Sequence, residues 1–286
     1  MLKWQVGDVT IASIVEMEIP VPWSPDHAFL KEATPEALKT LPWLFPHFCT
    51  PEGAIKLPFQ ALLVETRGMK LVVDTCIGND KPRRELGRQA LHTDFLKKCI
   101  AAGFGRNDVT HVVCTHLHVD HVGWNTMLEN GKWVPTFPNA RYLIGRKEYE
   151  HWRGETDDKA NMEILADSVT PIFEAGLAQQ VEMDHRLSPE VRLIPTPGHT
   201  PGHVSVLIES KGKSAVITGD MIHHPSQIAH PEWCPDVDFD KPAATAMRRA
   251  MLRDWADSSM LVIGSHFSAP TAGHVKKDGA AYKFVV

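Results

Sequence analysis

Residues 115–121 read THLHVDH and contain His116, His118, Asp120 and His121. They follow the apolar run HVVC, which predicts a short buried strand. His116 and His118 would point to the same side of an extended strand end, and Asp120 keeps that period. Close imidazoles are costly to bury without a partner, and a divalent cation removes that cost because neutral imidazole is its common ligand. The segment therefore predicts a metal site in a loop that leaves a strand, unlike the helical HExxH arrangement.

Three later motifs share this format. TPGHTPGH contains His199 and His203, VITGD ends at Asp220, and VIGSHF contains His266. Each is an apolar strand or turn that ends in a polar residue, and such loops commonly carry active sites. Five histidines and two aspartates exceed the needs of one tetrahedral metal, so we predict two metal ions.

Composition limits the classes of function. The chain has 286 residues and a formal net charge of −5, which argues against nucleic acid or an anionic membrane as the main partner. No apolar run reaches the roughly 18 residues of a spanning helix, and the start resembles neither a signal nor a transit peptide, so a cytoplasmic location is the default. Five cysteines without a CxxC motif favour reduced thiols. No linker divides the chain, so we expect a single domain over residues 1–286.

Hydrophobic patterning predicts strands interspersed with helices. Thr34 should cap a short helix that begins at Pro35. The predicted strands lie at 3–18, 59–66, 70–78, 111–116, 140–145, 191–195, 203–210, 214–220 and 259–267, the predicted helices at 88–102, 146–154, 159–175 and 242–256, and a hairpin at 274–286.

Residues 20–56 form an excursion rich in proline and aromatic residues. Its aromatics could pack on the body of the protein. Long loops are uncommon unless they do something, so a lid, a pocket wall or a homodimer contact is an equal alternative.

The pattern HxHxDH, followed by a distant histidine, an aspartate and a last histidine, resembles the metallo-β-lactamase superfamily. The segment VVDT at 72–75 contains Asp74 and resembles the first motif of that family. The resemblance implies an α/β fold of the αββα sandwich type, with two mixed β-sheets flanked by helices. It implies that His116, His118 and His199 hold one metal, that Asp120, His121 and His266 hold the other, and that Asp220 bridges them.

Around these ligands, Asp74 and His203 are predicted to orient the ligand set from behind. Imidazole with some carboxylate suits zinc, with iron, manganese or cobalt as alternatives. The resemblance further implies a metal-bridging hydroxide that attacks an electrophilic carbon or phosphorus, with Asp120 and Asp220 as the catalytic carboxylates.

Within the superfamily the chain resembles the branch of N-acyl-homoserine lactonases and methyl-parathion-hydrolase-like enzymes. Asp220 stands where true β-lactamases have a cysteine, which argues against β-lactam hydrolysis. We expect a small lactone, ester or phosphotriester as substrate, with lactonase activity and hence quorum quenching first. The tyrosine that lactonases use near the metals has no match among Tyr142, Tyr149 and Tyr282. The residues predicted to line the substrate pocket are Phe48, Trp124, Asn125, His223, His224 and Trp233.

Other functions remain open at this stage. An organophosphate or aryl-ester hydrolase could be the main activity, and a thioesterase similar to glyoxalase II is a further alternative. A non-catalytic metal-binding scaffold is a different class, and decayed scaffolds of this kind lose ligands that this chain keeps.

Overall fold

The computed structural model describes residues 1–83 and 90–286, which divide into two compact units. Unit 1 comprises Met1–Met17 and Phe59–His185, and unit 2 comprises Glu18–Pro58 and Arg186–Val286. The chain therefore passes between the units three times, and the sequence motifs described above are divided between them.

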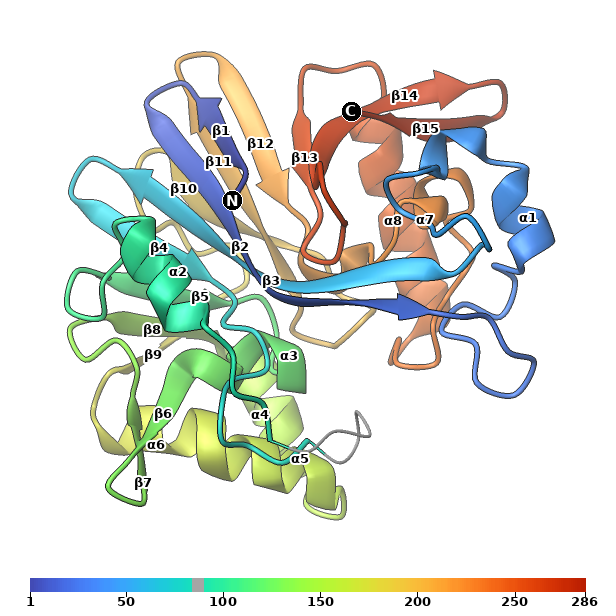
Figure 1. The fold of residues 1–286 in the computed structure, drawn as a ribbon. Coiled ribbons are helices and arrows are strands. Elements are labelled where there is room, and N and C mark those ends of the chain that lie inside the picture. The colour runs from blue at the N-terminus through green and yellow to red at the C-terminus, as the bar shows by residue number, and fades with distance from the viewer. Residues whose placement is uncertain (84–89) are drawn as a thin grey trace. The chain divides into compact units, whose positions relative to one another are not determined.

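The sheet of unit 1 has the strand order β1-β2-β3-β4-β5-β8-β9 (Figure 1). β4, β5, β8 and β9 run parallel, and this is why the HVVC run of β5 is continuously apolar: parallel strands are covered on both faces. β6 and β7 form a separate hairpin. The strands are β1 Lys3–Val6, β2 Val9–Val21, β3 Ile55–Thr66, β4 Met69–Val73, β5 His111–Cys114, β6 Thr126–Glu129, β7 Lys132–Pro135, β8 Arg141–Gly145 and β9 Ala178–Val181.

The helices predicted for unit 1 are present, but one of them begins later than predicted, and a short helix at Val119–Val122 lies where the sequence predicted a loop. The predicted helix over 88–102 begins at Phe95, and residues 88–89 lie outside the described residues. The side chain of Asn79 accepts from the Thr93 backbone N–H at 2.7 Å and donates to the Thr93 carbonyl, which holds Thr93 out of the helix. The helices are α2 Phe95–Ala101, α3 Val119–Val122, α4 Arg146–Gly154, α5 Lys159–Ile164, a π-helical turn at Leu165–Val169 and α6 Thr170–Glu174.

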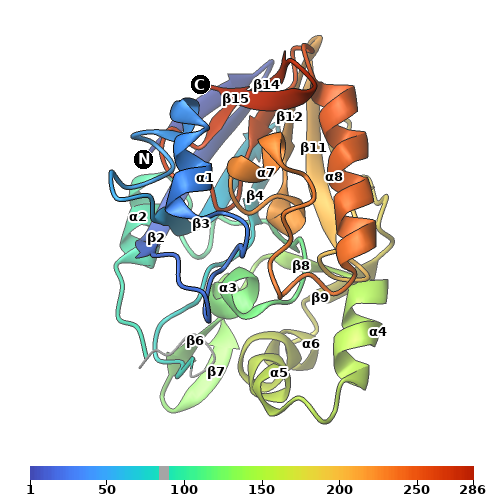
Figure 2. The ribbon, with the colours of Figure 1, turned by 90° about the vertical axis from the view of Figure 1, so that its right-hand side faces the viewer.

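The sheet of unit 2 has the order β10-β11-β12-β13-β14-β15, mostly antiparallel, with β12 and β13 parallel. α8 lies along this sheet (Figure 2), and its Leu252 and Trp255 share a buried core with Val216 and Val262. The elements are β10 Val191–Pro195, β11 Val204–Ser210, β12 Lys213–Ile217, β13 Leu261–Ile263, β14 Ala272–Asp278, β15 Ala281–Val285, α1 Pro35–Lys39, α7 Ser226–Ala229 and α8 Lys241–Trp255.

The aromatic excursion packs into unit 2. Phe48 is buried in its core, and Phe29, Trp43 and Phe45 are partly buried against that core. Thr34 caps α1 as predicted, because its Oγ1 accepts from the Ala37 N–H at 3.1 Å. The lid and dimer interpretations of the excursion stay predictions. Among the described residues, none of the helices is both long enough and apolar enough to cross a membrane.

Candidate metal centre

The first ligand set lies at the carboxyl ends of β4 and β5 in unit 1. These strands are parallel neighbours, so the residues that follow them meet at one edge of the sheet. Asp74 follows β4 with a φ of +58° and accepts from Thr115 twice, from the backbone N–H at 2.8 Å and from Oγ1 at 2.9 Å. A buried carboxylate is thereby fixed beside the start of the histidine motif.

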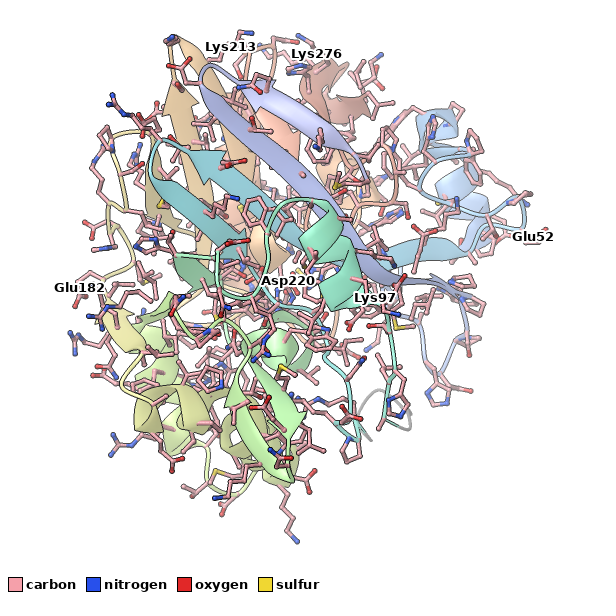
Figure 3. The ribbon with its side chains drawn as sticks, turned by 60° about the vertical axis from the view of Figure 1, so that its left-hand side comes forward. Glu52, Lys97, Glu182, Lys213, Asp220 and Lys276 are labelled. Atoms are coloured by element: carbon pink, nitrogen blue, oxygen red, sulfur yellow. The ribbon has the colours of Figure 1, made fainter. Side chains whose placement is uncertain are left out.

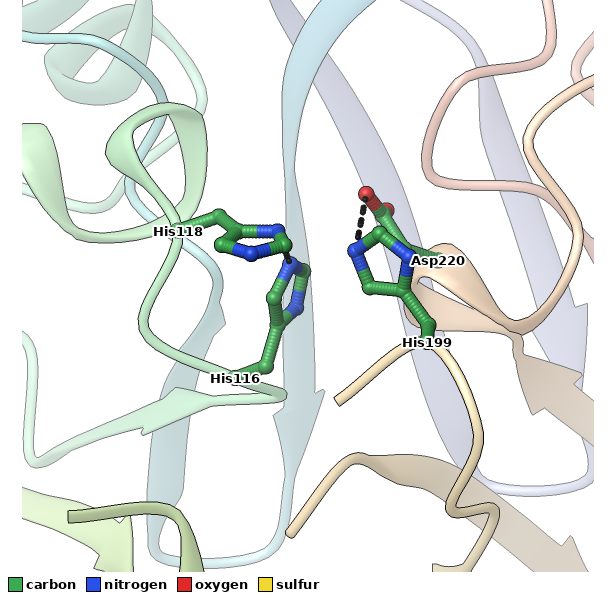
Figure 4. A group of neighbouring side chains, drawn as sticks. All are labelled: His116, His118, His199 and Asp220. Carbon is green, nitrogen blue, oxygen red and sulfur yellow. Dashed lines mark hydrogen bonds and ion pairs between the residues drawn. The ribbon is translucent and has the colours of Figure 1, made fainter. Parts of the chain in front are cut away.

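Asp74 also fixes the orientation of His121. Its Oδ2 lies 2.8 Å from His121 Nδ1, so in the neutral imidazole Nδ1 carries the hydrogen and Nε2 is the nitrogen left for a metal. The His116 and His121 rings lie 4.1 Å apart between centroids, and His116 Nε2 lies 3.0 Å from His118 Nδ1 (Figure 4). Asp120 Oδ2 lies 3.7 Å from His121 Nε2. The four motif residues therefore form one cluster of donors.

Local backbone structure produces this cluster. His118 is the extended N-cap of α3, so the chain turns at once and brings Asp120 and His121 back toward His116. Gly123 follows α3 at a very close approach, since a Cβ there would lie 1.9 Å from the carbonyl oxygen of Ile77. Only glycine allows the two backbones to lie this close.

The second ligand set centres on Asp220 in unit 2. The parallel strands β12 and β13 end side by side and are followed by the turns that carry Asp220 and His266. Asp220 Oδ2 lies 3.4 Å from His199 Nε2 and 3.3 Å from His223 Nε2, and its Oδ1 lies 3.1 Å from His266 Nε2. Asp220 is 4% exposed and lies among other side chains, unlike Glu52 and Lys213 at the periphery (Figure 3). Figure 4 shows the His199–Asp220 pair.

Hydrogen bonds from Nδ1 of His266 and of His199 decide that Nε2 of each ring faces Asp220. His266 Nδ1 donates to the carbonyl of Pro58 at 2.8 Å, and His199 Nδ1 donates to Asp238 Oδ1 at 2.9 Å. In neutral rings both Nε2 atoms then present lone pairs toward a carboxylate, an arrangement that favours a bound cation. Ligands about 3.3 Å apart are expected around a tetrahedral zinc with bonds of about 2.0–2.1 Å. The donor set of unit 2 therefore fits a divalent metal.

The protonation state of His199 also suits a ligand. Burial lowers the pKa of His199 to about 4, against the raising effect of its hydrogen bond to Asp238. The imidazole is thus neutral near pH 7, as a metal ligand must be. For Asp238, burial alone would raise the pKa, but the hydrogen bond from His199 and neighbouring positive charge, including Arg248, bring it to about 2.

His203 supports the second set from behind. Its Nε2 accepts from the backbone N–H of Asp220 at 2.9 Å, and its Nδ1 lies 3.1 Å from the carbonyl of Thr196. Gly198, with a φ of +140°, lets the His199 turn lie against α8, because a Cβ there would lie 2.5 Å from the backbone of Ala244. The structure thus places His203 beside Asp220, and its role in orienting the ligand set stays a prediction.

Comparison with known families agrees with this donor set. Residues 60–257 match the sequence profile of the Metallo-beta-lactamase superfamily, which is more than half of the chain. The chain belongs to the metallo-β-lactamase superfamily. Its mixed sheets with flanking helices are the fold of that superfamily, so the predicted α/β fold class is confirmed.

Two relatives show which proteins this metallo-β-lactamase superfamily member resembles in sequence. An N-acyl homoserine lactonase of Bacillus sp. is 27% identical over 180 residues, which is 59% of this chain and 65% of the relative. A probable metallo-hydrolase of Mycobacterium tuberculosis is 29% identical over 184 residues, which is 59% of this chain and 58% of that protein. The matches thus span less than two thirds of each relative.

Solved structures cover nearly the whole chain. AidC, described as a dizinc quorum-quenching lactonase in complex with a product, superposes with a TM-score of 0.79 at 24% identity, covering 99% of this chain and 96% of that one. The hydrolase AbOPH gives the same TM-score, identity and coverage. At this identity the likeness establishes the fold.

The residues predicted to line the pocket have different surroundings in this metallo-β-lactamase fold. His223 reaches Asp220, and its ring also meets Phe29 edge-on at 5.3 Å. His224 is fully buried and bonds Ser226 Oγ at 2.8 Å and the Phe48 carbonyl at 2.9 Å. The other four lie in the packed interior: Phe48 against Phe267 and Phe284, Trp124 stacked on Phe95 and bonded to Glu16, Asn125 bonded to Thr75, and Trp233 stacked on His230.

Sequence reasoning missed Asp238 and Arg248. Their side chains are fully buried, and Arg248 Nη1 lies 3.2 Å from Asp238 Oδ2. Asp238 lies in the acidic run DVDFD and Arg248 in the charged helix α8, so each resembles an ordinary surface residue in sequence. A signal for either residue would have required knowing that this loop folds inward beneath His199.

Proposed function

We propose that this protein is a dinuclear metal-dependent hydrolase that acts on a small lactone. Membership of the metallo-β-lactamase superfamily and the complete order of ligand motifs support this activity. Because the motifs are divided between the two units, we propose that both units act together as one catalytic domain. The first metal would be held by His116, His118 and His199, the second by Asp120, His121 and His266, with Asp220 shared.

The arrangement around Asp220 carries the proposal. Three imidazole Nε2 atoms lie 3.1–3.4 Å from one buried carboxylate, and two of the rings have their Nδ1 atoms occupied by acceptors. In the neutral rings the Nε2 lone pairs of His199 and His266 would be repelled by this carboxylate and costly to bury without a cation. Imidazole nitrogen with carboxylate oxygen suits zinc best among the common divalent metals.

Metal ions held by these residues would supply an activated water and would stabilise charge on the oxygen of the attacked carbonyl. The protein's own side chains do the rest. Asp74 and Asp238 lie within hydrogen-bond distance of Nδ1 of His121 and of His199. Asp120 is the candidate carboxylate to receive a proton and return it to the leaving alkoxide. His223 can donate a hydrogen bond to a substrate oxygen.

The choice of a lactone rests on the relatives. Similarity to N-acyl homoserine lactonases supports an acylated lactone substrate. AbOPH is described only as a hydrolase of the same superfamily, and aryl esters and phosphotriesters demand the same attack by water, so hydrolysis of these compounds is the second candidate.

Metal analysis and activity on one preparation test the proposal. We expect two equivalents of metal and turnover of N-hexanoyl-homoserine lactone above that of an aryl ester, a paraoxon-like phosphotriester and a glutathione thioester, abolished by a chelator. His116→Ala should lose metal and nearly all turnover, and Asp220→Ala should disturb both metals. His111→Gln, a change outside both ligand sets, should keep both properties. Full activity of His116→Ala or of the chelated protein would refute the proposal.

A further inference from the structure

The ligand His199 is tied to α8 through a buried pair of opposite charges in unit 2. Asp238 Oδ1 accepts from His199 Nδ1 at 2.9 Å, and Asp238 Oδ2 lies 3.2 Å from Arg248 Nη1. The side chains of Asp238 and Arg248 are both fully buried, and His199 is 1% exposed. These three side chains form a continuous line of contacts from the helix to the ligand.

Arg248 also reaches the turn that carries Asp220. The same Nη1 atom donates to the carbonyl of Met221 at 3.2 Å, while Nε donates to the carbonyl of Pro231 at 2.7 Å. The backbone of the Asp238 loop is joined to the His199 turn as well, since the N–H groups of Phe239 and Asp240 donate to the carbonyls of His199 and Gly198. The guanidinium of Arg248 thus contacts both the Asp238 loop, which is bonded to the His199 turn, and the turn that carries Asp220.

Stability alone does not explain a buried pair of this kind. Taking both charges out of water costs several kcal/mol per ion, and apolar residues of similar volume often replace such pairs with neutral or favourable effect. A carboxylate behind a ligand imidazole, in contrast, fixes its tautomer and ring orientation and raises its basicity. The geometry therefore favours a role in positioning the ligand.

We infer that Asp238, held by Arg248, is a positioning residue that keeps His199 in the Nδ1–H tautomer and directs its Nε2 to the metal. This inference rests on the proposed function for its metal, but the tautomer is a property of the metal-free protein. Asp238→Ala should weaken metal binding about 10- to 100-fold, because loss of such a partner commonly has this effect. Asp238→Asn keeps an acceptor oxygen and should bind more tightly than Asp238→Ala.

Two measurements separate positioning from stability. The first is zinc affinity by competition with a chelating dye, in Asp238→Ala, Asp238→Asn and the apolar pair Asp238→Leu with Arg248→Met. The second is the tautomer of His199 in the metal-free protein, from nitrogen-15 NMR of the imidazole assigned with His199→Gln. Val237→Ala, an exposed neighbour on the same loop, and Asp167→Asn, which removes the Arg83 ion pair of unit 1, are matched controls.

The expected result is a mixed or Nε2–H tautomer and weakened zinc binding in the Asp238 variants, with partial rescue in Asp238→Asn and no change in Val237→Ala. Unchanged tautomer and zinc affinity in Asp238→Ala would overturn the inference, and so would an equal loss of affinity in Asp167→Asn. If the unaltered protein bound no metal, the proposed function would fail, and the tautomer measurement would still judge the inference.

Discussion

His223 Nε2 lies 3.3 Å from Asp220 Oδ2, yet neither ring nitrogen of His223 makes a hydrogen bond within the part of the chain that the structure describes. The ring is 3% exposed, and buried polar atoms without partners are rare in proteins. The neighbouring His224 has both nitrogens bonded. The two adjacent histidines therefore have opposite surroundings, which leads to different expectations for each.

Replacing His223 should affect catalysis rather than folding. His223→Ala is expected to lower kcat about 100-fold, the usual effect of losing one donor to a developing oxyanion. Metal content and thermal unfolding should stay near those of the unaltered protein. Steady-state kinetics with metal analysis provide the check, and a variant with normal kcat would exclude contact between His223 and the reacting oxygen.

Replacing His224 should affect folding rather than catalysis. His224→Ala removes the imidazole contact of the Phe48 carbonyl, which still accepts from the Lys56 N–H, and it takes the Nδ1 partner from the hydroxyl and N–H of buried Ser226. A buried polar group left unsatisfied costs about 1–3 kcal/mol. Urea unfolding measures the loss of stability. The residual folded enzyme should keep its kcat, so a large drop in kcat at full folding would place His224 in the site instead.

Stability should fall with acid in a way that depends on His224. Burial lowers the pKa of His224 to about 4 from a usual value of 6.5. The unfolded chain then binds a proton more readily than the folded one, so this group's contribution is complete above about pH 6.5 and is lost as the pH falls toward 4. Urea unfolding of metal-free protein between pH 7.5 and 4.5 should show a shallower pH dependence in His224→Asn. Parallel curves for both proteins would contradict the assignment.

Asp74 should control the affinity for the metal that His121 is proposed to hold. Asp74→Ala removes the acceptor that holds His121, and metal affinity should fall about 10- to 100-fold. Because Asp74 also accepts from Thr115, Thr115→Val serves as a control that removes this hydroxyl's contacts with Asp74 and with His116 Nδ1 but leaves the Asp74–His121 bond in place. Dye competition distinguishes the two, and equal losses in both variants would assign the effect to the Thr115 contact.

Phe48 tests the difference between core and pocket. Its ring contacts Phe267 and Phe284 in the core of unit 2 and is 1% exposed. Phe48→Ala should destabilise the protein by about 3–5 kcal/mol, and the milder Phe48→Leu should leave KM unchanged. A KM that rises several-fold in Phe48→Leu at unchanged stability would restore Phe48 to the substrate pocket.

The sequence by itself determined the superfamily, the strands that end in ligands and the capped helix at Pro35. These features are local: an apolar run of four or five residues fixes a buried strand, and the polar residue after it must lie at the strand end. The start of α2 was wrong because Asn79, distant in sequence, bonds the residues before Phe95.

Only the tertiary structure decided which side chains support the ligands and which fill the core. Trp124 and Phe48 were predicted as pocket walls; the structure buries both, and their contact with substrate stays a prediction. In sequence, Asp238 and Arg248 resemble surface charges. In the folded protein the loop turns inward, so that Asp238 contacts both Arg248 and His199. The sequence sets the position of a residue along its helix or strand. The burial of its side chain and its hydrogen-bond partners depend on segments that lie tens to hundreds of residues away in the chain.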